Sequence, residues 1–213
     1  MYVRDIMTTN VVTIPSSTSV ADAKRIMEAH HICRLPVVDK GKLVGIVTDR
    51  RLESVSPSKA TSLTVWELSY LLDKTTVKEI MEKNVVTVSP DMTAEESLSL
   101  AQSNKVGALV VVEDGRVVGI ATTNDFFYNI VNPVLGLGQP GTRIEVSGGG
   151  EGKALEEIVS AVNRLGLGIT TLHIEVLPEA TKKDVCVHIN SEDVSKLVAE
   201  LKGKGYRVSV RKR

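Results

Sequence analysis

The chain has 213 residues, with 26 lysines and arginines against 26 aspartates and glutamates, so its formal net charge is zero. This charge excludes binding to nucleic acid or an anionic membrane through bulk charge, because such binding needs a basic excess. Aromatic residues make up only 3% of the chain, which leaves few stacking platforms for single strands. The 42% hydrophobic content is too high for a disordered protein, and the length allows one or two domains.

The sequence carries no sign of a membrane span or a leader. No apolar run approaches the ~18 residues that a transmembrane helix needs, and residues 1–5 lack the apolar segment of a secretory signal. The two cysteines, Cys33 and Cys186, have neither a disulfide framework nor zinc spacing. We therefore expect a cytoplasmic protein with no membrane or nucleic-acid partner.

An internal repeat organises the first 130 residues. Residues 4–52 align with residues 78–126 at a constant offset of 74, without a gap. The matching segments include Ile6-Met7 with Ile80-Met81, Val37-Val38 with Val111-Val112, and Val44-Gly45-Ile46 with Val118-Gly119-Ile120. Helix-capping pairs repeat as well, as Ser19 with Asp22 and Thr93 with Glu96. The chain therefore contains a duplicated unit.

Each copy is predicted to fold as strand, helix, strand, turn, strand and helix. In the first copy these are a strand at 11–14, a helix opened by Ser19, strands at 35–38 and 43–47, and a helix from Thr48. Lys40-Gly41 and Asp114-Gly115 supply the positive φ of a tight hairpin. Between the copies, Thr64 and Glu67 form a capping box, and Leu63 is expected to pack on Leu68. Trp66 on this connector helix is expected to be a packing residue.

The repeated motifs resemble a tandem pair of CBS domains, also called a Bateman module. The motifs are a lead-in ending in Met7 or Met81, the stretch Arg34-Leu35-Pro36-Val37-Val38-Asp39, and Gly-Ile-Val/Ala-Thr before the last helix. The resemblance implies copies that associate through their sheets, with ligand clefts between them. It also implies adenosyl ligands such as AMP, ADP, ATP or S-adenosylmethionine, and a regulatory role without catalysis or a catalytic cofactor.

Residues 142–213 have a different pattern, strand-helix-strand-strand-helix-strand, which is the ferredoxin-like order. With Gly152-Lys153-Ala154-Leu155 the segment is similar to an ACT domain, a family that often binds amino acids and pairs through its sheets. The CBS-CBS-ACT order resembles the acetoin-utilisation protein B family. The resulting α+β architecture has CBS domain 1 at 1–56, a connector helix at 57–77, CBS domain 2 at 78–131, a linker at 132–141 and an ACT-like domain at 142–213. The resemblance also implies a homodimer that forms through the CBS and ACT-like domains.

The ligand motif of CBS families is complete only in the second copy, as Gly119-Ile120-Ala121-Thr122-Thr123-Asn124-Asp125. A carboxylate at a helix start can accept bonds from both hydroxyls of a ribose, and Thr122 adds a hydroxyl on the same side. Ile120 and Ala121 suit an adenine. The alternative is that Thr122 and Asp125 only cap the helix. In the first copy Arg51 stands where the second has Asp125, and arginine cannot accept a hydrogen bond.

By resemblance, the Asp125 cleft is also lined by Met7, Ile32, Cys33 and Arg34 of the first copy. Arg34 is the expected phosphate partner because a guanidinium makes two parallel bonds to oxygens; its alternative is a surface ion pair. The second, weaker cleft would hold Thr48, Arg51, Val106 and Gly107, where Arg51 reaches phosphates or closes the cleft. We therefore expect unequal clefts, with the Asp125 cleft the better nucleoside binder.

Other motifs are weaker. Gly136-Leu137-Gly138-Gln139-Pro140-Gly141 matches a dinucleotide fingerprint but leads into a strand and is interpreted as linker. The glycine-rich loop before Lys153 is a possible amino-acid site through Gly150, Gly152 and Lys153. His173 and His188 are expected to form a solvated or dimer-contacting pair, with Glu175 and Cys186 nearby, and no metal site is predicted.

The sequence thus predicts a regulatory protein that binds an adenosine-containing ligand and signals through an ACT-like dimerisation or amino-acid-binding domain, or to a partner enzyme that the sequence does not identify. The alternative is a structural or assembly module whose clefts stay empty. No catalytic constellation is found, so an enzyme is not expected. The association with acetoin utilisation rests on the family resemblance alone.

Overall fold

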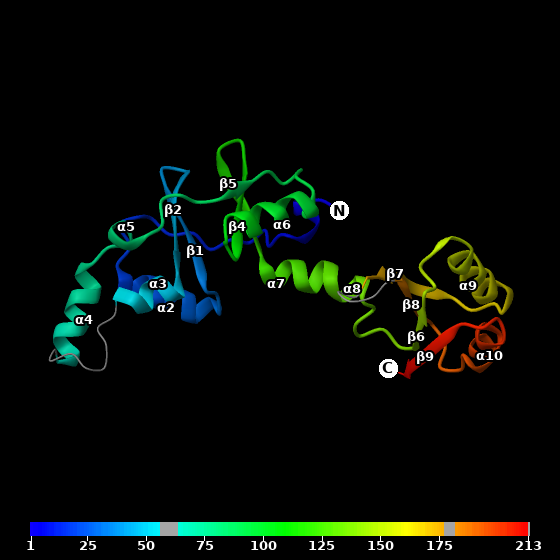
Figure 1. The fold of residues 1–213 in the computed structure, drawn as a ribbon. Coiled ribbons are helices and arrows are strands. Elements are labelled where there is room, and N and C mark those ends of the chain that lie inside the picture. The colour runs from blue at the N-terminus through cyan, green and yellow to red at the C-terminus, as the bar shows by residue number, and fades with distance from the viewer. Residues whose placement is uncertain (56–63, 177–181, 213) are drawn as a thin grey trace. The chain divides into compact units, whose positions relative to one another are not determined.

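The computed structural model describes residues 1–55, 64–176 and 182–212 (Figure 1). Its contacts divide the chain into two compact units, Met1–Phe126 and Phe127–Arg213. Unit 1 contains both copies of the repeat, and unit 2 contains the ferredoxin-like segment. Among the described residues, no helix is long and apolar enough to cross a membrane.

The first copy contains five elements: α1 (Val3–Ile6), α2 (Val20–His30), β1 (Arg34–Asp39), β2 (Lys42–Thr48) and α3 (Asp49–Val55). The connector helix α4 (Val65–Lys74) follows. The second copy contains α5 (Val77–Ile80), β3 (Thr87–Val88), α6 (Ala94–Ser103), β4 (Ala108–Glu113), β5 (Arg116–Thr122) and α7 (Thr123–Phe126). The predicted duplication is confirmed at the level of individual elements.

The two central hairpins share one register. Arg34 pairs with Thr48 in β1–β2, and Ala108 pairs with Thr122 at the matching place in β4–β5. Each hairpin has a bulge after the same valine, Val37 or Val111. Lys40-Gly41 and Asp114-Gly115 all have positive φ, as a two-residue hairpin turn requires. The predicted turns are therefore confirmed.

The first predicted strand differs between the copies. In the second copy it is β3, which runs parallel to β4, and Val110 N–H donates to the carbonyl of Val86 at 3.2 Å. In the first copy only Ile14 pairs with Val37, as an isolated bridge. Pro36 stands where the second copy has Val110 and has no N–H to donate, so one ladder bond cannot form.

The lead-in of each copy pairs with the last strand of the other copy. Thr8 exchanges two backbone hydrogen bonds with Ile120, both 3.0 Å, and Glu82 exchanges two with Ile46, both 2.9 Å. The sulfur of Met7 lies against Gly119, where a Cβ would overlap it, and Met81 occupies the matching place at Gly45. These reciprocal contacts join the two copies with an approximate twofold relation.

The connector helix α4 begins at the predicted capping box. Thr64 Oγ1 accepts from the Glu67 backbone N–H at 3.3 Å, and Thr64 N–H donates to the Glu67 carboxylate at 2.8 Å. The prediction for Trp66 is wrong, because this side chain is 86% exposed on the helix. Helical spacing alone did not show which turn of the connector faces the first copy. The expected contact between Leu63 and Leu68 lies outside the described side chains.

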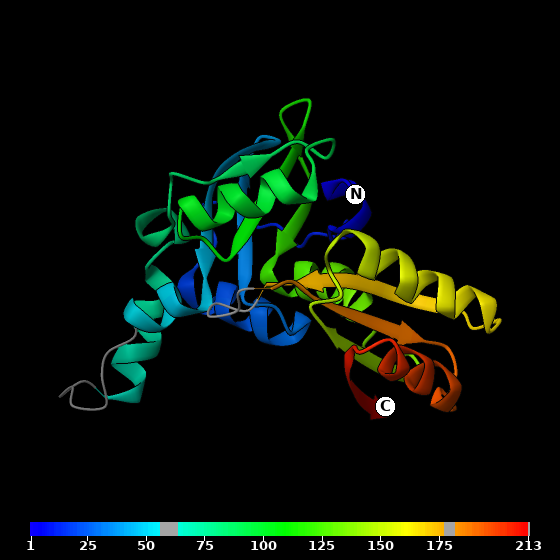
Figure 2. The ribbon, with the colours of Figure 1, turned by 45° about the vertical axis from the view of Figure 1, so that its right-hand side comes forward.

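Unit 2 opens with a π-helical segment, η1 (Phe127–Val131), and a short helix, α8 (Asn132–Val134). Its remaining elements are β6 (Thr142–Ser147), α9 (Gly152–Arg164), β7 (Ile169–Glu175), β8 (Asp184–Ile189), α10 (Ser195–Gly203) and β9 (Arg207–Lys212). The strand order is β7-β8-β6-β9, with every pair antiparallel. This is the predicted ferredoxin-like arrangement. The β7–β8 pair, yellow and orange, can be followed in Figure 2.

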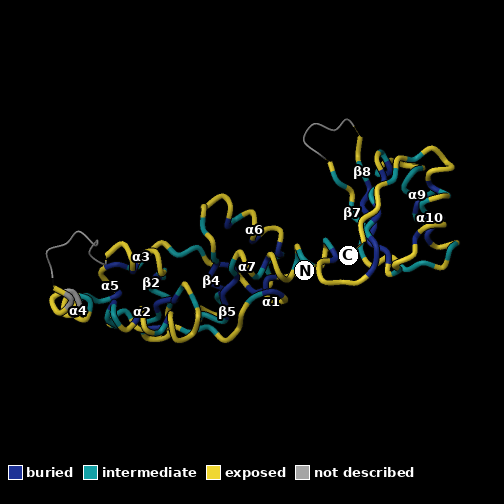
Figure 3. Tube along the Cα trace, turned by 90° about the horizontal axis from the view of Figure 1, so that it is seen from below, coloured by how far each residue is buried: buried dark blue, intermediate teal, exposed yellow. Residues whose placement is uncertain are grey.

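The core of unit 2 lies between the sheet and the two helices, which cover the same face of the sheet (Figure 1). Alternate strand residues point into this core, including Ile144, Val146, Val185, Val187 and Ile189. The buried stretch along β8 is visible in Figure 3. The intervening residues of the strands therefore point to the opposite face, called the polar face below.

The segment at 132–141 was predicted as a linker, but it includes α8 and packs on the sheet. A side chain at Gly136 would overlap the ring of His188, and a Cβ at Gly141 would overlap the carbonyl of Ile189. His188 is only 2% exposed, which contradicts the expected solvated or dimer-contacting pair of His173 and His188. Sequence alternation placed His188 on the polar face but did not show that the preceding segment covers it.

Candidate functional site

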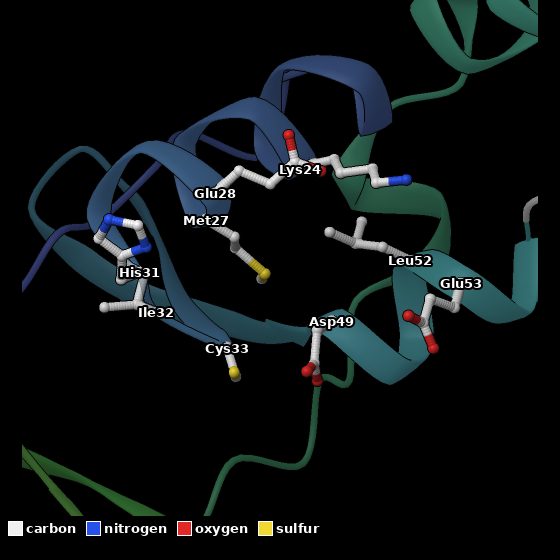
Figure 4. A pocket seen from close by; sticks show the side chains of 9 residues that line it. All are labelled: Lys24, Met27, Glu28, His31, Ile32, Cys33, Asp49, Leu52 and Glu53. Atoms are coloured by element: carbon white, nitrogen blue, oxygen red, sulfur yellow. The ribbon is translucent and has the colours of Figure 1, made fainter.

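Each copy of the repeat has a cavity at the same place. The first, of about 400 Å³, lies between α2 and α3 and is lined by Met27, Ile32, Cys33, Asp49 and Leu52 among others (Figure 4). The second, of about 360 Å³, is lined at the matching positions by Ala101, Val106, Gly107, Thr123 and Phe126. Every one of these pairs is separated by the same offset of 74.

The two cavities differ in charge. The first carries three acidic side chains, Glu28, Asp49 and Glu53, against one lysine, Lys24. Figure 4 shows Cys33 and Asp49 next to each other at its edge, and a hydrogen bond with Asp49 raises the pKa of the Cys33 thiol. Lys105 is the one lysine or arginine in the lining of the second cavity, which includes no acidic residue. An anionic ligand is therefore disfavoured in the first cavity and tolerated in the second.

Asp125 caps the helix that follows β5. Its Oδ2 accepts hydrogen bonds from the Thr122 backbone N–H at 2.7 Å and from the Thr122 hydroxyl at 2.6 Å. Its other oxygen, Oδ1, accepts a long bond of 3.4 Å from the hydroxyl of Thr8. The Oδ2 oxygen of Asp125 therefore has the capping role that was the alternative to ligand binding. The Oδ1 oxygen is held weakly enough to exchange its hydrogen-bond partner.

The contact with Thr8 joins the predicted ribose-binding group to the lead-in of the first copy. Thr8 follows Met7, which was predicted to line this cleft, and Met7 lies against Gly119 of the ligand motif. The sequence analysis missed Thr8. The repeat itself contained the signal, because Thr8 occupies the position of Glu82, and each of these residues pairs with the last strand of the other copy.

Arg34 also crosses from the first copy to the second. A Cβ built on Gly107 would lie 2.9 Å from Nη2 of Arg34 and 3.6 Å from Oγ1 of Thr123. The guanidinium therefore lies beside two residues that line the second cavity. The absence of a side chain at Gly107 makes room for it. Thr123 was not among the predicted site residues, although it directly follows Thr122.

Arg51 is held by the structure of the first copy. Its Nε donates to the carbonyl of Ile80 at 2.9 Å, and its backbone N–H donates to the Thr48 hydroxyl at 3.2 Å. The side chain thus ties α3 to α5, the lead-in of the second copy. Arg51 thus contributes to the contact between the two copies, and the two roles considered for it at the second cleft stay predictions.

The predicted site residues do not all line one cavity. Ile32 and Cys33 line the first cavity, whereas Ala121, Val106 and Gly107 line the second. Ile120, on β5, is 9% exposed, and its backbone is hydrogen-bonded to that of Thr8. The structure gathers Met7, Thr8, Thr122 and Asp125 around the end of β5. Arg34 of the first copy lies beside Gly107 of the second. Met7, Arg34, Thr122 and Asp125 are not among the residues that line these two cavities.

The glycine loop of unit 2 is tightly packed. A Cβ on Gly150 would lie 2.7 Å from Lys183 and 2.9 Å from Ile174, so the absence of a side chain lets the loop approach β7. Gly152 begins α9 with φ of 40°. The Lys153 side chain is 87% exposed and lies 3.9 Å from Glu157 one helical turn later.

Comparison with known proteins identifies the family of unit 1. The CBS domain family matches residues 3–56 and 77–132, which together cover more than half of the 213 residues. The chain therefore belongs to the CBS domain family. CBS domain pairs are regulatory ligand-binding modules.

Relatives in sequence fall into two kinds. The inosine-5'-monophosphate dehydrogenase of Korarchaeum cryptofilum is 36% identical over 125 residues, which is 58% of this chain and 23% of that enzyme. The CBS domain-containing protein YhcV of Bacillus subtilis is 28% identical over 127 residues, 60% of this chain and 84% of YhcV. The chain thus spans less than a quarter of the enzyme's length, and the enzyme is matched only through its CBS part.

Two solved structures are similar to this chain. A putative acetoin utilization protein (AcuB) from Vibrio cholerae has 34% identity and a TM-score of 0.52, covering 62% of this chain and 91% of that one. The CBS domain pair of protein MJ0100, in complex with 5'-methylthioadenosine and S-adenosyl-L-methionine, has 30% identity and a TM-score of 0.51. It covers 62% of this chain and 97% of the other.

Proposed function

We propose that unit 1 senses an adenosine-containing ligand bound around Asp125 in the second copy. The observation that carries this proposal is the long hydrogen bond, 3.4 Å, that Oδ1 of Asp125 accepts from the Thr8 hydroxyl. A ribose hydroxyl can take the place of Thr8 at this oxygen and gain a shorter, charge-assisted bond. The Oδ2 oxygen keeps its bonds to Thr122, so ligand binding leaves the helix cap intact.

Shape and charge favour the second copy over the first. The second cavity is lined by Ala121, Thr123 and Phe126, which are chain neighbours of the two site residues, and not by Thr122 or Asp125 themselves. Its lining of small and aliphatic side chains suits a flat apolar base. The Arg34 guanidinium beside Gly107 offers a cation for a phosphate or carboxylate group of the ligand. The similar CBS pair of MJ0100, in complex with two adenosyl compounds, supports the same ligand class.

A ligand at Asp125 would act on the contact between the copies. Because Thr8 bonds both Asp125 and, through its backbone, Ile120, a ligand that displaces the Thr8 hydroxyl changes one of the links between the lead-in and β5. A ligand can shift the arrangement only by binding one state better than another. In this proposal the change passes to unit 2, as an ACT-like dimerisation domain, or to a partner enzyme.

Isothermal titration of the full chain with AMP, ATP, 5'-methylthioadenosine and S-adenosylmethionine tests the proposal. We expect at least one of them to bind, and Asp125→Ala to weaken it by roughly 10- to 100-fold, as the loss of charged hydrogen bonds predicts. Glu96→Ala is the matched control, because it removes the same kind of capping box from α6 and should keep the wild-type affinity.

The alternative function is an assembly module with empty clefts. It predicts no heat with any of the four compounds and no nucleotide in the purified protein. Equal losses of affinity in Asp125→Ala and Glu96→Ala would also contradict the site, since they would show that only helix stability matters.

A further inference from the structure

The polar face of the unit 2 sheet gathers three side chains that can ligate a metal. His173 and Glu175 are two residues apart on β7, and Cys186 on β8 is paired directly with His173. Strand geometry places all three on one face, because alternate residues share a face and paired residues have adjacent side chains. The three come from a single hairpin and belong to one compact unit.

Their donor atoms are already close together. One nitrogen of His173, one carboxylate oxygen of Glu175 and the Cys186 sulfur all lie within 4.8 Å of one another. Bonds of about 2.0–2.3 Å to a tetrahedral zinc put neighbouring donors about 3.5 Å apart. Small side-chain rotations therefore bring the three into coordination distance without moving the strands.

We propose that His173, Glu175 and Cys186 bind a zinc ion, with the fourth position left to water or another ligand. Imidazole nitrogen, thiolate sulfur and carboxylate oxygen are all zinc ligands in proteins, and the thiolate disfavours magnesium or calcium. When the Sγ–metal bond forms, the thiol releases its proton to solvent. The Glu175 carboxylate and the thiolate then balance the two positive charges of the ion.

Arg143 contacts two of the three proposed ligands, Glu175 and Cys186. Its Nη2 lies 2.8 Å from Oε1 of Glu175, the same oxygen that His173 Nε2 approaches at 2.8 Å. The Arg143 side chain also reaches the sulfur of Cys186. When the ion binds, the guanidinium therefore has to leave the sulfur, and it keeps its bond to the Glu175 carboxylate. Glu145, which is paired with Cys186 from β6, adds a second negative charge to this face of the sheet. Arg143 is thus a positioning residue.

The same face contains polar atoms without partners. Among the described residues, His173 Nδ1, Thr171 Oγ1 and Arg143 Nε are buried and make no hydrogen bond. Such atoms are uncommon in a folded protein, and a bound water, ion or ligand usually satisfies them. A metal-bound histidine usually donates its second ring nitrogen to a neighbour, and Thr171 offers a hydroxyl two residues away on the same strand face.

Cobalt(II) titration of the full chain tests this site, because a thiolate bound to cobalt gives an intense near-ultraviolet absorption band. We expect one equivalent of cobalt to produce the band and zinc to remove it by displacement. The band should be lost in Cys186→Ser and kept in Cys33→Ser, which changes the other cysteine, in unit 1. No band in the wild type, or a band that depends on Cys33, would overturn the proposal.

Because Cys186 is buried, a Cys186→Ser protein that does not fold would also lose the band. His173→Gln and Glu175→Gln provide a second test, because these side chains are 17% and 30% exposed. Both should keep the wild-type thermal unfolding without metal and lose the stabilisation that zinc gives the wild type. Arg143→Gln should lower the affinity for zinc by about 10-fold. Unchanged zinc affinity in both ligand variants would contradict the site.

Discussion

The guanidinium of Arg34 in the first copy lies against Gly107 of the second, at a distance of 2.9 Å from the position a Cβ would take. The two residues are almost equivalent in the repeat, since Gly107 matches Cys33 and Arg34 matches Ala108. The two central hairpins share one backbone register, whereas the side chains around them are unequal. Only the second cavity has an arginine of the other copy beside it at this place in the described structure.

Arg34→Ala should weaken the binding of ligands that carry a phosphate and leave the binding of ligands without one nearly unchanged. If the guanidinium binds phosphate, AMP binding falls by roughly 10- to 100-fold, because charged hydrogen bonds contribute about 1.5–3 kcal/mol. Binding of 5'-methylthioadenosine, which has no phosphate, should change little. Arg116→Ala removes a charge from the exposed start of β5 and serves as the control. Equal effects of Arg34→Ala on both ligands, measured by calorimetry, would contradict the assignment.

Gly119→Ala should weaken the contact between the copies. The new methyl group overlaps the sulfur of Met7, and overpacking of this kind costs about 1–3 kcal/mol. Urea unfolding of the full chain measures the change, and Gly45→Ala should behave alike because Met81 lies against it. Gly203→Ala is the control, since nothing lies within 4 Å of a Cβ there. A Gly119→Ala protein as stable as the control would show that the lead-in is not tightly packed.

Trp66→Ser should leave the free energy of unfolding within about 0.5 kcal/mol of the wild type, because the side chain is largely exposed. Trp66 is the one tryptophan in the sequence, so its fluorescence reports on α4 alone. The emission should be that of a solvated indole and should be quenched by iodide. A blue-shifted, unquenched emission would mean that a second copy or another segment covers α4.

Acid should weaken the start of the second copy through Glu79. The Thr76 backbone N–H, together with the Thr76 hydroxyl, lowers the pKa of Glu79 below its ordinary 4.5. A carboxylate whose pKa is lowered on folding contributes its full stabilisation above pH 4.5. This contribution is lost as the pH falls through the folded-state pKa. Glu79→Gln should therefore be less stable than the wild type at neutral pH, with the difference shrinking in acid. A difference that grows below pH 4.5 would contradict this account.

Local signals in the sequence predicted most of the fold. The offset of 74 indicated the duplication, the capping pairs marked the starts of α2, α4 and α6, and alternation indicated the strands of unit 2. These features depend on residues near one another in the chain. The exposed Trp66 and the cover over His188 depend on tertiary contacts, which periodicity does not report.

The candidate site was predictable in part. The Gly-x-x-Thr-x-x-Asp motif directed attention to Thr122 and Asp125, and family resemblance added Met7 and Arg34. Thr8 could not be found from the motif, because its contact with Asp125 joins residues 117 positions apart. The proposed zinc site could not be predicted for the same reason. The pairing of His173 with Cys186 depends on the register of the β7–β8 pair, which the sequence did not define.

The stoichiometry of nucleoside binding tests the central claim most directly. Calorimetric titration of the full chain with the tightest of the four adenosyl compounds should give one site per chain, and Asp125→Ala should weaken this site by roughly 10- to 100-fold while Glu96→Ala keeps the wild-type affinity. Two equal sites per chain, or an unchanged single site in Asp125→Ala, would contradict the account that the second copy alone binds the ligand through Asp125.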